Sequence, residues 1–148
     1  MKVLVSACLL GEACRYDGKS KSQELPRGME YYPICPEVEG GLSIPRDPAE
    51  KVGDVVMTKK GMDVTEAFVR GAQAALELAQ KEGIKYALLK ENSPSCGVHC
   101  IYDGSFSGRL LPGAGVTTDL LRQAGVKVFN EKEGAELERE SREADKKG

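Results

Sequence analysis

Three short apolar runs in this chain each lead to a cysteine, and this repeated arrangement constrains the fold more than any other feature. The runs are residues 2–7 before Cys8, residues 31–34 before Cys35, and residues 86–89, which a polar loop connects to Cys96. Runs of this length and composition are typical of buried strands. If the strands are parallel neighbours, their carboxyl ends share one edge of a sheet, where open α/β folds bind ligands. The sequence therefore predicts that three thiols, distant along the chain, meet at one site.

The rest of the pattern predicts a three-layer α/β fold, with a Rossmann-like, mainly parallel sheet of about four to five strands and a small hairpin. Turn residues at 53–54 and 59–61 separate short apolar pieces, which favours the hairpin. Apolar residues recur at helical spacing between residues 64 and 79, so a helix is expected before the strand that ends at Leu89. A second helix from near Thr117 to Gly125 should precede a last short strand.

A length of 148 residues, 41% of them hydrophobic, is typical of one globular domain. We expect residues 1–131 to form a single cluster-binding α/β domain and residues 132–148 to form a charged C-terminal helix of the same domain. The segment from Pro36 to Pro48 is rich in proline and glycine and predicts a loop held over the site. Another turn-rich loop is expected at residues 102–108, after Cys96.

Charge and cysteine usage exclude several classes of protein. The net charge of −2 gives no reason to expect bulk nucleic-acid binding. The apolar run before Cys8 is too short for a signal peptide, and no stretch reaches the roughly 18 apolar residues of a membrane span, so we expect a cytoplasmic protein without membrane attachment. The five cysteines include no C-x-x-C pair, which excludes zinc ribbons and thioredoxin-like motifs. The fold must assemble any metal site.

Three thiolates without a fourth cysteine ligand fit either a catalytic zinc site or a 4Fe-4S cluster with one open iron. Glu37 lies two residues after Cys35 and is the candidate general base for activating a water molecule. Ser93 and Ser95 either cap a turn or hydrogen-bond a polar ligand. A lone histidine such as His99 is most often a solvated surface residue.

Several further loop residues lie close to the predicted site. The basic ones are candidates for binding a phosphate on the substrate, although each is by default a solvated side chain: Arg15, Lys19, Arg46 and Lys90. Cys14 and Cys100 are interpreted as packing residues near the site rather than ligands.

The motifs also carry a resemblance to a known family. The segments VSACLLGEACRYDGKSK, ICPEVEGGLSIPRDPAE, KENSPSCG, IYDGSFSG and GVTTDLLRQAGVKVFNE resemble the bacterial family called domain of unknown function 523, which includes thiouracil desulfidases of the TudS type. The resemblance covers residues 1–131, and the order SACLLG, CPE, SPSCG is specific. It implies a 4Fe-4S cluster held by Cys8, Cys35 and Cys96 with one iron left open, and it maps catalytic roles onto Glu37 and Ser93.

The resemblance implies an enzyme that removes sulfur from a thiolated pyrimidine of the thiouracil or thiouridine type. The products would be hydrosulfide and uracil, or the corresponding nucleoside or nucleotide. Glu37 would activate the attacking water, and Ser93 would steady the intermediate or relay a proton, with Ser95 as the alternative hydroxyl. The cluster would come from iron–sulfur assembly machinery. Two other functions fit the same thiolates: a non-catalytic iron–sulfur or persulfide carrier, and a zinc-dependent hydrolase.

Overall fold

A four-stranded, fully parallel sheet forms the centre of the molecule. The computed structural model describes residues 1–11, 17 and 24–147. The strand order is β2-β1-β5-β8, with bounds Glu30–Ile34, Lys2–Ser6, Tyr86–Leu89 and Lys127–Asn130. Every neighbouring pair is parallel, so all four carboxyl ends lie at the same edge. This arrangement confirms the predicted α/β class with a mainly parallel sheet.

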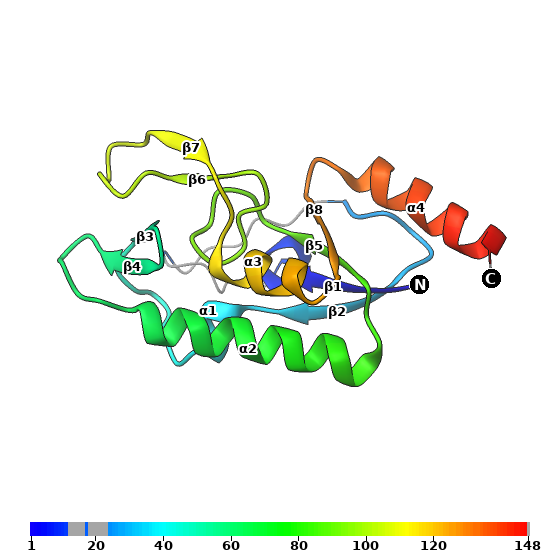
Figure 1. Cartoon of the computed structure of the whole chain (residues 1–148), viewed down its shortest axis with the longest axis horizontal. Helices are drawn as coiled ribbons and strands as arrows, with labels where there is room; N and C mark the ends of the chain where they lie inside the picture. The colour runs from blue at the N-terminus through cyan, green and yellow to red at the C-terminus, as the bar shows by residue number, and fades with distance from the viewer. Residues whose placement is uncertain (12–16, 18–23, 148) are drawn as a thin grey trace.

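Helices cover both faces of the sheet. Figure 1 shows α2 (Thr65–Glu82) and α4 (Gly134–Lys147) on opposite sides of it, and α3 (Val116–Gln123) packs against α2. Alternate strand residues face the two layers, as the strand period of two requires. Leu4 and Leu89 join the core cluster under α2 and α3, whereas Val3, Val5 and Leu88 pack with the fully buried Leu137 of α4. Among the described residues, no helix combines the length and the apolar character needed to span a bilayer.

Two small antiparallel hairpins lie beside the sheet. The first pairs β3 (Ala49–Val52) with β4 (Val55–Thr58), as predicted. The second pairs β6 (Cys100–Tyr102) with β7 (Leu110–Pro112), and these two strands were not predicted. The loop expected at residues 102–108 largely coincides with the connection between them. Each strand has only three residues, too few for a visible alternation of polar and apolar positions.

The segment after Cys35 begins with a helical turn, α1 (Pro36–Glu39), instead of a loop. Proline suits the first turn because its fixed φ is already helical and the turn needs no N–H at that point. Helix α1 packs closely on α2: a Cβ on Gly71 would lie 1.8 Å from the carbonyl oxygen of Pro36. The absence of a side chain at Gly71 therefore lets two backbones touch, and this contact fixes Cys35 and Glu37 relative to the helical layer.

Candidate active site

A cavity of about 540 Å³ opens at the carboxyl end of the sheet. Three of the segments that line it follow β1, β2 and β5, and they contribute Cys8, Cys35 and Cys96 respectively. Glu37 and Ser93 line the same cavity. The structure thus brings together three thiols, a carboxylate and a hydroxyl from neighbouring strand ends.

Each thiol is positioned by a local turn. Cys8 lies one residue beyond the start of a 3-10 helix (Ala7–Leu10), which ends where the N–H of Gly11, at φ 96°, donates to the Cys8 carbonyl oxygen at 3.2 Å. Cys35 is the N-cap of α1, and its carbonyl oxygen accepts the N–H of Glu39 at 2.9 Å. Cys96 follows the loop after β5, and its carbonyl oxygen accepts the Thr118 hydroxyl at 3.0 Å. Hydrogen-bonded backbone therefore holds all three positions.

The environment of Cys96 disfavours a bare thiolate. Burial raises the pKa of the Cys96 thiol to about 12, and the nearby Glu37 carboxylate and Cys35 act in the same direction. Hydrogen bonds from Ser6 and Ser95 oppose this rise in the pKa without cancelling it. A cation that binds the sulfur would offset the burial penalty, because metal ligation stabilises the deprotonated form.

The two candidate serines occupy different places. The Ser93 hydroxyl oxygen accepts the backbone N–H groups of Ser95 at 3.0 Å and Cys96 at 3.1 Å, which occupies both of its lone pairs and leaves its hydrogen to donate. Ser95 is fully buried and does not line the cavity. Its hydroxyl shares a 2.8 Å hydrogen bond with Thr117 of α3. Ser93 is therefore the hydroxyl that can meet a ligand in the cavity.

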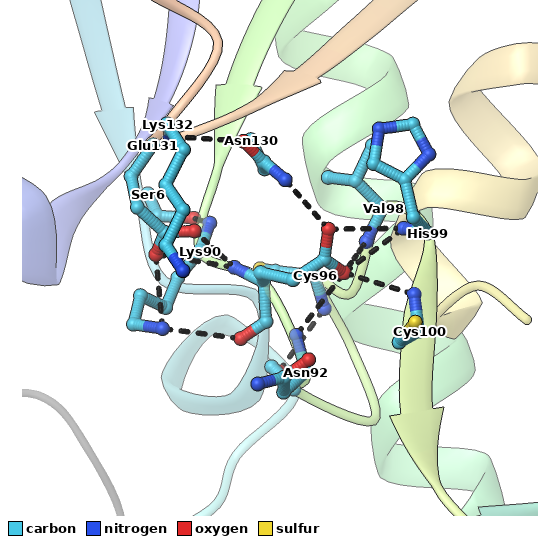
Figure 2. Close-up of polar contacts among 12 residues, drawn as sticks. Ser6, Lys90, Asn92, Cys96, Val98, His99, Cys100, Asn130, Glu131 and Lys132 are labelled. Atoms are coloured by element: carbon cyan, nitrogen blue, oxygen red, sulfur yellow. Dashed lines mark hydrogen bonds and ion pairs between the residues drawn. The ribbon is translucent and has the colours of Figure 1, made fainter. Parts of the chain in front are cut away.

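The basic candidates are engaged with carboxylates. Arg46 forms an ion pair with Glu37 at 3.4 Å, and their side chains are 7% and 20% exposed. Arg46 lines an adjoining cavity that shares Glu37 with the first one. Lys90 lines the thiol cavity. Its side-chain ammonium group pairs with Glu131 at 2.9 Å, and its backbone N–H donates to the Ser6 hydroxyl (Figure 2). Arg15, Lys19 and Cys14 lie outside the described residues.

Glu91 organises the loop that carries Ser93 and Cys96, and sequence reasoning gave it no role. Its carboxylate accepts backbone N–H groups from the segment after Cys96, namely those of Val98 at 2.6 Å, His99 at 2.9 Å and Cys100 at 3.1 Å. Asn130 donates its side-chain amide to the same carboxylate at 2.8 Å. Figure 2 draws this bond as a dashed line from the labelled Asn130 side chain. These partners lie seven to nine residues later or on another strand, so no local pattern in the sequence predicts them.

The hydrogen bonds keep Glu91 ionised. Burial favours the neutral acid, but the amide of Asn130 and the backbone N–H groups of His99, Cys100 and Val98 outweigh it and lower the pKa of Glu91 from 4.5 to about 2. A carboxylate whose pKa is lower in the folded protein than in the unfolded chain stabilises the fold at pH values above its unfolded-state pKa. This stabilisation is lost as the pH falls through its folded-state pKa.

Replacing Glu91 with glutamine should flatten the pH dependence of unfolding between about pH 4.5 and pH 2. The variant should also lose about 1.5–3 kcal/mol of stability at pH 7, because hydrogen bonds to a charged group are replaced by weaker ones. Urea unfolding at a series of pH values measures both effects. Glu136→Gln, on the exposed side of α4, is the matched control and should keep the parental profile. An unchanged slope in the Glu91 variant would contradict this role.

The chain is similar to known proteins over most of its length. A family model described as 2-thiouracil desulfurase matches residues 3–133. The uncharacterized protein YbbK of Bacillus subtilis is 43% identical over 145 residues, which cover 88% of this chain and 96% of that protein.

A solved structure described as the 4Fe-4S-dependent thiouracil desulfidase TudS is 50% identical, with a TM-score of 0.89 over 92% of this chain and 94% of that one. The fold likeness and the family match confirm the predicted resemblance to TudS-type desulfidases. Since the family model extends over nearly the whole α/β domain, including all three strand-end cysteines, this chain belongs to the 2-thiouracil desulfurase family.

Proposed function

We propose that this protein is a 4Fe-4S-dependent desulfidase that replaces the sulfur of a thiolated pyrimidine with oxygen. The products are hydrosulfide and uracil, or the corresponding nucleoside or nucleotide. The observation that carries the proposal is the meeting of Cys8, Cys35 and Cys96 in one cavity with Glu37 and Ser93. The related structure described as a 4Fe-4S-dependent thiouracil desulfidase, at 50% identity, supports the same chemistry.

The donor set fits an iron–sulfur cluster. Cys8, Cys35 and Cys96 line one cavity, and a 4Fe-4S cluster takes each cysteine thiolate on a different iron atom. Cys8, Cys35 and Cys96 would hold the cluster, which when bound supplies one open iron, a Lewis acid that polarises the carbon–sulfur double bond.

In this proposal Glu37 is the general base. Its carboxylate lies 3.4 Å from the guanidinium of Arg46, and a carboxylate is a group that can accept a proton from water. In the proposed reaction Glu37 takes one proton from water, and the water oxygen bonds to the ring carbon. The second proton of that water passes to the sulfur as the carbon–sulfur bond breaks, so sulfur leaves as hydrosulfide and oxygen takes its place. The reaction is a hydrolysis without net electron transfer.

Ser93 supplies a hydrogen-bond donor in the same cavity. Because its oxygen already accepts two backbone N–H groups, the hydroxyl can only donate to a ligand. A donor of this kind stabilises negative charge that develops on the substrate as water attacks. Glu37 and Ser93 therefore have complementary roles, one accepting a proton and the other donating a hydrogen bond.

The thiols also indicate the cellular setting of the proposed enzyme. The described cysteines Cys8, Cys35, Cys96 and Cys100 carry thiols rather than disulfides. Thiols that must stay reduced to bind a cluster require a reducing compartment such as the cytoplasm. The proposal includes delivery of the cluster by iron–sulfur assembly machinery.

Anaerobic purification followed by assay of 2-thiouracil turnover tests the proposal. We expect a brown protein that contains iron and acid-labile sulfide and that releases uracil and hydrosulfide in equal amounts. In ¹⁸O-labelled water the label should enter uracil. Colourless protein containing zinc would instead indicate a zinc hydrolase, and an iron–sulfur protein without turnover would indicate a carrier; either result contradicts the proposed activity.

A further inference from the structure

The cavity has an aromatic wall that the proposed chemistry does not use. Among the described lining residues, the aromatic ones are Tyr102 and Phe106. Both come from the second hairpin, Tyr102 as the last residue of β6 and Phe106 from the loop between β6 and β7. The thiols, Glu37 and Ser93 come instead from segments that follow strands of the main sheet.

Phe106 has an unusual backbone conformation. Its φ of 56° lies in the left-handed region, which an aromatic residue seldom adopts. Such a conformation costs free energy and persists only where the surrounding structure imposes it, as happens at ligand-binding positions.

Glu50 imposes the conformation from the neighbouring hairpin. One carboxylate oxygen of Glu50 accepts the N–H groups of Gly104 at 2.9 Å and Phe106 at 3.1 Å. The loop also lies directly on β3, because a Cβ on Gly104 would be 2.2 Å from the Val52 side chain. At its ends the loop is closed by the N–H of Asp103, which donates to the Arg109 carbonyl oxygen at 3.0 Å. Phe106 is thus held at the cavity by two hairpins.

We propose that Phe106 is the surface on which the pyrimidine ring stacks, and that Glu50 is the positioning residue that keeps Phe106 there. This inference rests on the proposed function, which supplies a planar ring as substrate. None of the roles proposed for the thiols, Glu37 and Ser93 is a contact with a face of the ring. Aromatic side chains bind the π face of any pyrimidine, whichever edge carries the sulfur. The site therefore selects planar thio-heterocycles over saturated thioureas.

Steady-state kinetics of Phe106 variants test the stacking role. Phe106→Ala should raise KM for 2-thiouracil by about 5- to 150-fold, the range that corresponds to the loss of one base–aromatic stack, with a much smaller change in kcat. Phe106→Tyr keeps the aromatic face and should restore KM, whereas Phe106→Leu keeps only the apolar bulk and should not. Ser107→Ala, an exposed position in the same loop, is the control. Equal KM values for the leucine and tyrosine variants would overturn the proposal.

A fluorescence titration separates this inference from the reaction itself. The chain contains no tryptophan, so Phe106→Trp introduces a single reporter into the cavity. Uracil, which has the ring but no sulfur to lose, should quench this fluorescence in the holoprotein, while the exposed Ser107→Trp should not respond. Quenching without thiouracil turnover would support ring stacking and reject the proposed reaction. Turnover without quenching would reject ring stacking alone.

A double-mutant cycle tests Glu50. Glu50→Ala should raise KM in the same direction as Phe106→Ala, because it releases the loop. If Glu50 acts through Phe106, adding Glu50→Ala to Phe106→Ala should change KM little further. Fold-changes that simply multiply in the double variant would show that Glu50 acts independently, which would overturn its positioning role.

Discussion

Glu37→Gln is expected to lower kcat by a factor of about 10²–10⁴, the usual contribution of a general base, while the protein keeps its iron. Glutamine preserves the size of the side chain but cannot take a proton from water. The position of Glu37 in the cavity, beside the cysteines and paired with Arg46, is the reason to expect so large an effect. The measurement is single-turnover desulfurisation of 2-thiouracil by anaerobic protein with matched iron content.

Glu39→Gln is the matched control, since Glu39 belongs to the same turn of helix but is exposed and does not line the cavity. It should leave kcat unchanged. The Glu37 variant loses one partner of Arg46, so its thermal unfolding should be compared with that of the parent protein to separate a local structural change from lost proton transfer. A Glu37→Gln protein that turned over at the parental rate would remove Glu37 from the mechanism.

Single serine substitutions at Cys8, Cys35 and Cys96 are expected to abolish turnover and to lower iron content by at least about tenfold. Losing a residue that only supports a metal ligand already costs about tenfold or more in metal affinity, and losing the ligand itself should cost no less. Each replaces a soft thiolate with a hydroxyl, which is a poor ligand for iron–sulfur clusters. Iron, acid-labile sulfide and the visible absorption of anaerobic protein give the cluster content of each variant.

Cys100→Ser provides the internal comparison. Cys100 is half-buried at the start of β6, and its backbone N–H, not its thiol, contacts Glu91. Cys100 does not line the cavity, so the Cys100→Ser variant should keep most of its iron. The Cys14→Ser variant is expected to keep most of its iron as well. Equal iron loss at Cys100 and Cys96 would mean that the ligand set was assigned wrongly.

The meeting of the three thiols could be predicted from sequence because it depends on local signals. Each apolar run predicts a strand, and parallel strands place their carboxyl ends together, so Cys8, Cys35 and Cys96 follow from pattern and topology. The hairpin at β3 and β4 and the long helix α2 were also visible, since turn residues and helical spacing are local features.

The parts of the site that sequence reasoning missed depend on contacts between distant segments. Glu91 and Glu50 each bind backbone N–H groups of a different segment, and a glutamate that binds backbone looks like any other glutamate in the sequence. The aromatic wall required the β6–β7 hairpin, whose strands are too short to be recognised. Ser95 and Ser93 could not be separated either, because only the packing of α3 shows that Ser95 turns to Thr117.

The strand order also has a consequence for biosynthesis. Strand β5 pairs with β1, yet 79 residues separate the end of β1 at Ser6 from the start of β5 at Tyr86. At a synthesis rate of about 5–20 residues per second, Cys96 is added to the nascent chain roughly 3–12 s after Cys35. During that interval a nascent chain exposes an unpaired edge of β1 and carries an incomplete set of strand-end thiols. The cluster can therefore be inserted only after β5 and Cys96 have been translated. A chaperone that covers the exposed edge of β1 would be needed before that point.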